Sequence, residues 1–274
     1  MRALAAGFTI TAICLGRAAF ATCDGVDGVC EMDSGEYHLV LPEDPQEQSP
    51  VVVFLHGFGS NGGNVIKNSR LLDPLLERGY AVIAPNATEG EPGGRKRWTF
   101  YPGWPGRDET VFLREVVDDA AARFGTSDER VMLSGFSSGA FMVNYLACDA
   151  PDTFAAYAPV AGGFWKPHPA QCNGPVRLFH THGWRDSTVP LEGRSLGGGR
   201  FQQGDIFAGL DIWRSANECK DEKPNSFSET GDFLRRKWTD CNPNAALELA
   251  MFPGGHTVPD GWADMALDWF EALE

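Results

Sequence analysis

The stretch Gly135-Phe136-Ser137-Ser138-Gly139 lies between an apolar, strand-like run at 131–133 and a helix-like segment at 139–148. A serine with a glycine two positions away on either side can occupy a sharp turn from strand to helix, whose strained backbone needs small neighbours. The glycine spacing puts Ser137 rather than Ser138 at the apex of this turn, so we predict that Ser137 is a nucleophile. The alternative is a purely structural turn, because glycine is common in this chain, with 32 residues.

Strand-like and helix-like runs alternate along the rest of the chain. The predicted strands are 37–41, 51–55, 81–84, 131–133, 157–160, 176–180 and 247–252. The predicted helices are 64–78, 108–124, 139–148, 205–217 and 262–273. This order predicts an α/β protein with a mostly parallel central sheet and helices on both faces. We find no internal repeat and no linker, so residues 22–274 are expected to form a single catalytic domain.

The first 21 residues have the pattern of a signal peptide. Arg2 precedes an apolar run at 3–15, and Ala19-Phe20-Ala21 forms a small-x-small cleavage site. We therefore expect removal of residues 1–21 and secretion, either to the periplasm or to the extracellular medium. The apolar run is too short to span a bilayer, so no stable membrane span is expected after cleavage, and an uncleaved anchor is the alternative.

Cleavage would leave six cysteines, an even number that suits an oxidising compartment. Six cysteines can pair in many ways, but these fall into three sequential couples. The grouping predicts the disulfides Cys23–Cys30, Cys148–Cys172 and Cys219–Cys241. No Cys-x-x-Cys pair occurs, which disfavours a zinc site.

The chain is acidic, with a formal net charge of −14. This charge disfavours nucleic acid and anionic membranes as partners. The basic cluster at 95–97 lies in a loop rich in Gly, Pro and Trp, and we interpret it as a solvated loop rather than a phosphate site. The irregular stretch 86–107 around it is predicted to cover or wall a site, because it holds several aromatic residues: Trp98, Phe100, Tyr101 and Trp104.

A serine nucleophile needs a histidine to accept its proton and a carboxylate to hold that histidine in the right tautomer. Asp186 follows the predicted strand 176–180, and His256 follows the last predicted strand in a Gly-Gly-His turn. We therefore predict that Asp186 is the acid and His256 the base. Asp205 and Asp211 remain alternative acids, and a role in the core or at the surface is the alternative for His256.

The predicted strand 51–55 ends in a His-Gly-Phe-Gly turn. An oxyanion hole needs backbone N–H groups near the nucleophile, so we predict that Phe58 and Ser138 supply them. Phe136 and Trp184 adjoin the predicted catalytic residues and are candidates for a substrate pocket, with a place in the core as the alternative.

His180 and His182 form a His-x-His pair, a spacing that places both side chains on one face of a strand. Such a pair can bind a metal ion, but the sequence offers no third ligand nearby. We therefore interpret the two histidines as packing beside the sheet and expect no metal.

Together these motifs resemble those of the secreted esterases of the polyhydroxybutyrate depolymerase and feruloyl/acetylxylan esterase group of α/β-hydrolases. The resemblance covers nearly all of residues 22–274 and rests on the segments 55–57, 135–140, 158–163 with the flanking Cys148 and Cys172, 182–186 and 254–257. It implies an α/β-hydrolase fold, a Ser137–His256–Asp186 triad and no cofactor. It also implies hydrolysis of carboxylic esters through an acyl-enzyme. Hydroxyalkanoate oligomers and the feruloyl or acetyl esters of plant polysaccharide are the substrates it implies.

Two departures from this group bear on the substrate. Trp184-Arg185 stands where such enzymes usually have small residues before the acid, which leaves the shape of the pocket open. The sequence given shows no polymer-adsorbing domain after the last predicted helix, so small or oligomeric esters are expected rather than a crystalline polymer. A serine peptidase with the same triad and a non-catalytic secreted glycan-binding protein remain alternatives, and the sequence predicts no oligomeric state.

Overall fold

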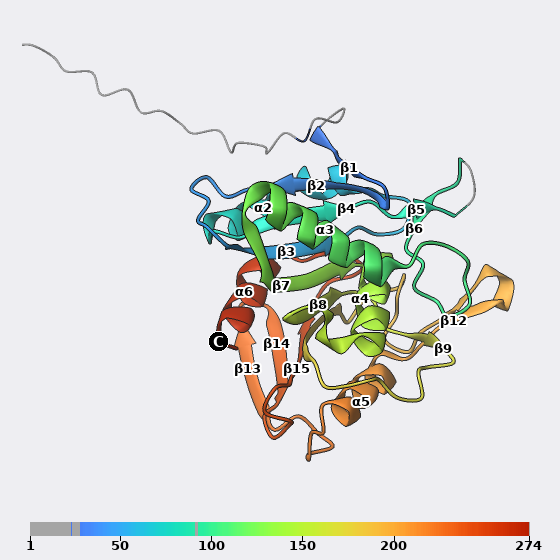
Figure 1. Ribbon diagram of the computed structural model, residues 1–274. Helices are drawn as coiled ribbons and strands as arrows, with labels where there is room; N and C mark the ends of the chain where they lie inside the picture. The colour runs from blue at the N-terminus through green and yellow to red at the C-terminus, as the bar shows by residue number, and fades with distance from the viewer. Residues whose placement is uncertain (1–22, 24–27, 91–92, 274) are drawn as a thin grey trace, which may run out of the picture.

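The computed structural model describes residues 23, 28–90 and 93–273, and the predicted signal peptide lies outside this range. A ten-stranded sheet forms the centre of the molecule (Figure 1). In spatial order its strands are β1 (Cys30–Met32), β2 (Gly35–Val40), β4 (Ala81–Pro85), β3 (Ser49–Leu55), β7 (Thr126–Phe136), β8 (Ala156–Val160), β10 (Arg177–Gly183), β15 (Ala246–Phe252), β14 (Phe233–Trp238) and β13 (Ser226–Thr230). The strands from β4 to β15 run parallel, and antiparallel strands extend both edges. The predicted mostly parallel sheet is confirmed.

Helices cover both faces of this sheet. Val51 and Val53 of β3 belong to one buried cluster with residues of α3 (Glu109–Phe124), α4 (Ser138–Asp149) and α5 (Ile206–Ala216). Val52 and Phe54 point to the opposite face and belong to a second cluster with residues of α1 (Gly62–Ile66), α2 (Ser69–Glu77) and α6 (Trp262–Glu271). Because neighbouring residues of a strand face opposite ways, a strand buried on both faces needs a continuous apolar run, which 51–55 supplies. Among the described helices, none is long and apolar enough to cross a membrane.

The long excursions lie at the carboxyl end of the parallel strands. The segment after β4 forms a hairpin of β5 (Thr88–Glu89) and β6 (Lys96–Arg97). Segments after β8 and β10 form a small sheet of β9 (Trp165–Lys166), β11 (Ser195–Leu196) and β12 (Phe201–Gln203). Short 3-10 helices lie at Pro151–Thr153 and Gly197–Gly199. In a parallel sheet, ligands bind at the carboxyl ends of the strands.

One predicted helix is divided in the structure. The expected helix 64–78 consists of α1 and α2, which are separated at Asn68, whose ψ of 88° is not helical. The carbonyl oxygen of Asn68 accepts hydrogen bonds from the N–H groups of Leu71 and Leu72, so Asn68 begins a new helix rather than continuing the first. The Asn68 side chain makes no capping hydrogen bond, so its backbone conformation alone marks the break between the two helices.

The hairpin of β13 and β14 was not predicted. Arg235, Arg236 and Lys237 interrupt the apolar alternation of β14 and resemble a loop in the sequence. In the structure the Arg235 side chain is paired with the buried carboxylate of Glu248 on β15, and its guanidinium lies over the Phe179 ring. A charged residue can therefore point into the sheet when a buried partner compensates it.

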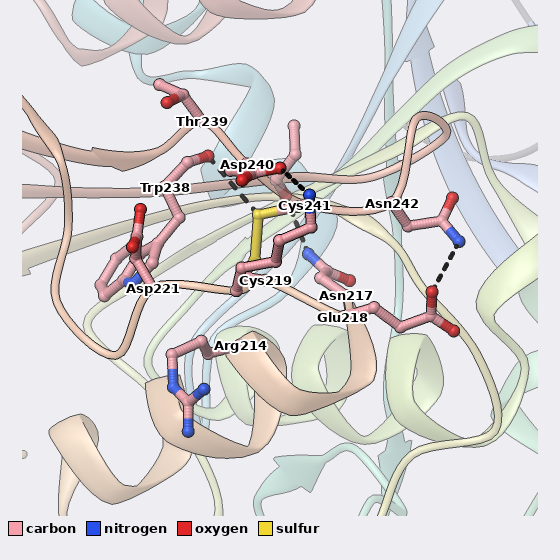
Figure 2. Close-up of a disulfide and its surroundings, with 12 residues drawn as sticks. Arg214, Asn217, Glu218, Cys219, Asp221, Trp238, Thr239, Asp240, Cys241 and Asn242 are labelled. Atoms are coloured by element: carbon pink, nitrogen blue, oxygen red, sulfur yellow. Dashed lines mark hydrogen bonds and ion pairs between the residues drawn. A yellow bond between two sulfur atoms is a disulfide. The ribbon is translucent and has the colours of Figure 1, made fainter.

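The structure joins all three predicted cysteine couples by disulfides. Cys219–Cys241 ties the end of α5 to the segment after β14 (Figure 2). Beside it lies the fully buried Asn217, whose side chain donates hydrogen bonds to the carbonyl oxygens of Val176 (3.0 Å) and Ala246 (3.2 Å). These contacts fix the starts of β10 and β15, the two strands whose far ends lead to Asp186 and His256.

Candidate active site

Ser137 lies in a sharp turn between β7 and α4. Its φ of 57° and ψ of −115° are strained for a residue with a side chain, and its N–H donates to the carbonyl oxygen of Val160 at 3.0 Å. The two glycines of the motif are required by close approach. A Cβ on Gly139 would lie 2.2 Å from the carbonyl oxygen of Leu55, and one on Gly135 would lie 2.7 Å from the Gly139 carbonyl carbon. The spacing from which Ser137 was predicted therefore has a steric cause.

The three residues predicted to form a triad lie in one hydrogen-bonded chain. The Nε2 atom of His256 is 2.9 Å from Ser137 Oγ, and its Nδ1 atom is 2.7 Å from Asp186 Oδ2. Asp186 is 5% exposed, and its Oδ1 atom accepts hydrogen bonds from the N–H groups of Thr188 and Val189, each at 2.8 Å. An ionised Asp186 accepts a hydrogen bond from Nδ1–H of His256, which leaves the Nε2 lone pair directed at Ser137.

Burial pushes the pKa of Asp186 upward, but the hydrogen bonds from His256 and from the two backbone N–H groups outweigh burial and lower it overall. The carboxylate is therefore ionised at neutral pH.

The two alternative acids, Asp205 and Asp211, belong to α5 and its N-cap. Asp205 caps α5 by accepting the N–H of Ala208, and Asp211 is next to Arg214 on the same helix.

Close contact of two backbone loops brings Asp186 to His256. A Cβ on Gly183 would lie 2.5 Å from the carbonyl oxygens of Gly254 and Gly255, so only glycine fits between β10 and the loop that carries His256. The N–H of Arg185 donates to the Gly254 carbonyl at 3.0 Å. The acid and the base are thus fixed relative to each other by backbone contacts as well as by their side chains.

The turn after β3 lies against Ser137, as the oxyanion prediction requires. A Cβ on Gly57 would be 3.6 Å from the Cβ of Ser137. The excursion after β4 holds this turn: Trp98 Nε1–H donates to the His56 carbonyl at 2.9 Å, and the Gly59 N–H donates to the Lys96 carbonyl at 2.9 Å. Part of the aromatic stretch 86–107 therefore supports the turn, a role that the sequence did not indicate for Trp98.

Ser138 is the first residue of α4, so its N–H is among the helical N–H groups that have no acceptor inside the helix. Phe58 is in the middle of the turn beside Ser137, and its side chain is 56% exposed. The two residues predicted to supply the oxyanion hole therefore belong to two segments that adjoin the nucleophile, and their role stays a prediction.

The candidate pocket residues differ in their contacts. The Phe136 ring lies 4.6 Å from the imidazole of His256, measured between ring centroids, so it packs on the predicted base. Trp184 follows β10 directly, and its side chain is 42% exposed. Phe136 thus supports the triad, whereas the exposed rings of Phe58 and Trp184 are available for contact with a bound molecule.

A cavity of about 560 Å³ lies beside the second half of α4. Its lining includes Tyr101, Trp104, Tyr145, His168 and Asn173, but no member of the triad. The prediction that the stretch 86–107 walls a site is therefore correct only in part, because this wall faces a cavity along α4 rather than the nucleophile.

His180 and His182 were interpreted as packing residues, and the structure places them beneath the triad acid. The carbonyl of Val189 can only accept, so His182 Nε2–H donates to it at 2.8 Å, and His182 Nδ1 then accepts from His180 Nε2–H at 3.2 Å. Burial lowers the pKa of both rings, so both are neutral. No group of three His, Cys, Asp or Glu side chains suited to a metal ion occurs in the described part of the chain.

Acid should destabilise the protein through its buried histidines. Burial lowers the pKa of His56 to about 4, whereas an unfolded histidine titrates near 6.5. Between these values the unfolded state binds a proton that the folded state does not, so stability is complete above pH 6.5 and falls with decreasing pH. For His56 alone the expected loss at pH 5.5 is on the order of 1 kcal/mol, and His180 and His182 act in the same direction. Urea unfolding at pH 8 and at pH 5.5 measures the loss, and equal stabilities would contradict it.

Comparisons with known proteins agree with this fold. A family model described as "alpha/beta hydrolase fold" matches residues 50–190. The chain is similar to a "Poly(3-hydroxyalkanoate) depolymerase C" of Paucimonas lemoignei, with 29% identity over 46% of this chain and 31% of the relative, so it spans about a third of that protein. It is also 24% identical to a "Probable feruloyl esterase C" of Aspergillus terreus, over 84% of this chain and 79% of the relative. Among solved structures, an acetyl xylan esterase from Aspergillus awamori superposes with a TM-score of 0.63 at 18% identity, covering 86% of this chain and 94% of that one.

Proposed function

Because the chain belongs to the α/β-hydrolase family, we propose that it is a serine esterase, which hydrolyses carboxylic esters through an acyl-enzyme formed on Ser137. The observation that carries this proposal is the continuous hydrogen-bonded chain from Ser137 through His256 to the buried Asp186. Its geometry is that required for a serine to lose its proton as it attacks a carbonyl carbon.

In the proposed mechanism His256 Nε2 accepts the proton of Ser137 as Oγ attacks the ester carbonyl. The N–H groups of Phe58 and Ser138 stabilise the oxyanion of the tetrahedral intermediate. The imidazolium of His256, which faces the ionised Asp186, then protonates the leaving alcohol. A water molecule repeats the sequence on the acyl-enzyme and releases the acid.

The proposed substrates are small or oligomeric esters, either hydroxyalkanoate oligomers or the feruloyl and acetyl esters of plant polysaccharide. The names of the similar proteins support these classes: a polyhydroxyalkanoate depolymerase, a feruloyl esterase and an acetyl xylan esterase. The exposed rings of Phe58 and Trp184 suit contact with an apolar or aromatic part of the substrate. We further propose that the enzyme acts outside the cytoplasm, because its three disulfides require an oxidising compartment.

A labelling experiment and a substrate panel test the proposal. A fluorophosphonate probe should label the folded protein on Ser137, since it reacts with activated serines. A panel of an aryl cinnamate, an acetylated sugar and a hydroxybutyrate oligomer identifies the ester class, and a matched anilide tests the peptidase alternative. Faster hydrolysis of the anilide than of the esters would favour the peptidase. Folded protein that neither reacts with the probe nor hydrolyses any ester would favour the glycan-binding alternative.

His182 is expected to position the acid through Val189. Val189 accepts the Nε2–H of His182 with its carbonyl and donates its own N–H to Asp186. His182→Leu removes that donor and leaves a buried carbonyl unpaired, so kcat should fall about tenfold with KM nearly unchanged. His182→Gln keeps an N–H donor and should recover most of the rate. The kinetic constants should be referred to the fraction of protein that the fluorophosphonate titrates, because a loss of folded protein alone would lower that fraction and not the rate per site.

A further inference from the structure

Three consecutive cations, Arg95, Lys96 and Arg97, lie beside the oxyanion turn, and their partners differ. Lys96 Nζ is 2.9 Å from the carboxylate of Glu36, and the guanidinium of Arg97 lies 4.6 Å from the centre of the Trp104 ring. Arg95 is exposed, and the described part of the chain gives it no carboxylate partner.

Arg95 is held against the turn that carries the predicted oxyanion donor. Its guanidinium lies 5.7 Å from the centre of the exposed Phe58 ring. A Cβ on Gly59 would lie 3.2 Å from Arg95 Cδ. The N–H of Gly59 also donates to the carbonyl of Lys96, the residue that follows Arg95. The Arg95 guanidinium and the Phe58 ring therefore lie together at the edge of the proposed active site, and we call this pair the rim.

The order of the strands places this rim on the side of the nucleophile opposite to His256. Ser137 follows β7, and His256 follows β15, three strands away in one direction. Arg95 belongs to the excursion after β4, two strands away in the opposite direction (Figure 1). Strands lie about 4.8 Å apart, so the excursion that carries Arg95 leaves the sheet about 10 Å from the strand that leads to the nucleophile. Because His256 must protonate the leaving alcohol, the alcohol lies toward β15. The oxyanion faces the turn after β3, so an acyl chain that extends away from the alcohol passes along this turn and toward Arg95.

We propose that Arg95 binds a carboxylate at the far end of the acyl group, so that the enzyme prefers esters of dicarboxylic acids to esters of neutral acids of the same shape. The guanidinium supplies a pair of parallel N–H donors to the carboxylate. The Phe58 ring packs against the methylene chain between the two ends of the acid. This inference rests on the proposed esterase activity and names one class of its substrates.

Two esters of the same shape test the proposal: mono-4-nitrophenyl adipate and 4-nitrophenyl 6-methylheptanoate. The second replaces the terminal carboxylate by an isopropyl group. The measured quantity is the ratio of their kcat/KM values, adipate over methylheptanoate. This ratio should fall about fivefold in Arg95→Gln and be largely kept in Arg95→Lys. In the wild type it should also fall as the salt concentration increases from about 0.02 M to about 0.5 M.

Arg236→Gln is the matched control, because Arg236 also lies over an exposed phenylalanine, Phe227, with 4.9 Å to the ring centre, but on the hairpin at the far edge of the sheet. This variant should leave the ratio unchanged. An unchanged ratio in Arg95→Gln, or an equal loss with both esters, overturns the carboxylate site while leaving the esterase proposal intact. A wild type that hydrolyses neither ester overturns both.

Discussion

Ser137→Ala should abolish ester hydrolysis, with kcat lowered by about a millionfold, because removal of a nucleophile costs about that factor in serine hydrolases of the same chemistry. Without Oγ no acyl-enzyme can form, and only the oxyanion donors and substrate binding remain to accelerate direct attack by water. The variant keeps Cβ, so the packing of the turn at φ 57° is retained and the fold should persist. Hydrolysis of a 4-nitrophenyl ester measures the loss, and the thermal unfolding midpoint shows whether the variant is folded.

Ser138→Ala is the matched control, since it changes the adjacent hydroxyl while keeping the backbone N–H that is proposed to face the oxyanion. Its rate should stay within about an order of magnitude of the wild type, and the fluorophosphonate probe should still label it. Labelling of Ser137→Ala at the wild-type rate would place the nucleophile at another residue. Loss of labelling in Ser138→Ala alone would exchange the two assignments.

The sequence predicted the parts of this site whose geometry is local. The glycines around Ser137 could be recognised because the space for a side chain is limited within five residues of sequence and by one neighbouring strand. A Cβ on Gly139 would clash with the backbone of Leu55 on that strand. Asp186 and His256 could be placed because each follows a strand, and the ends of parallel strands meet at one edge. What these predictions required was the order of elements, not their side-chain contacts.

Features that depend on contacts between distant segments were not predictable. Trp98 supports the oxyanion turn by donating to the backbone of His56, which is 42 residues earlier. His182 could be recognised as a buried histidine, but its bond to Val189 depends on how the loop after β10 folds back. Likewise β14 was missed because the partner that allows Arg235 to point into the sheet, Glu248, is on another strand.

Asp186→Asn should lower kcat by about ten-thousandfold, and the hydrogen bonds around the acid explain why. Oδ1 of Asp186 accepts two backbone N–H groups, whereas Oδ2 accepts Nδ1–H of His256. An asparagine must direct its oxygen toward the two N–H groups, because an amide NH₂ cannot accept them, and its NH₂ then faces His256. That NH₂ donates to Nδ1, so the proton of a neutral imidazole moves to Nε2. The ring then donates to Ser137 instead of accepting its proton.

Asp205→Asn is the matched control for this tautomer argument. Asp205 caps α5 by accepting one N–H, and asparagine is as good a cap as aspartate, so both stability and kcat should be nearly unchanged. Asp186→Asn should retain a KM close to that of the wild type, because the substitution alters a proton position and no substrate contact. The same tautomer should slow fluorophosphonate labelling, since the probe needs the same activated Oγ. The opposite result would be an Asp186→Asn variant that hydrolyses esters at nearly the wild-type rate, while Asp205→Asn or Asp211→Asn does not. In that case the acid is Asp205 or Asp211, and the loop after β10 must rearrange to bring that residue to His256.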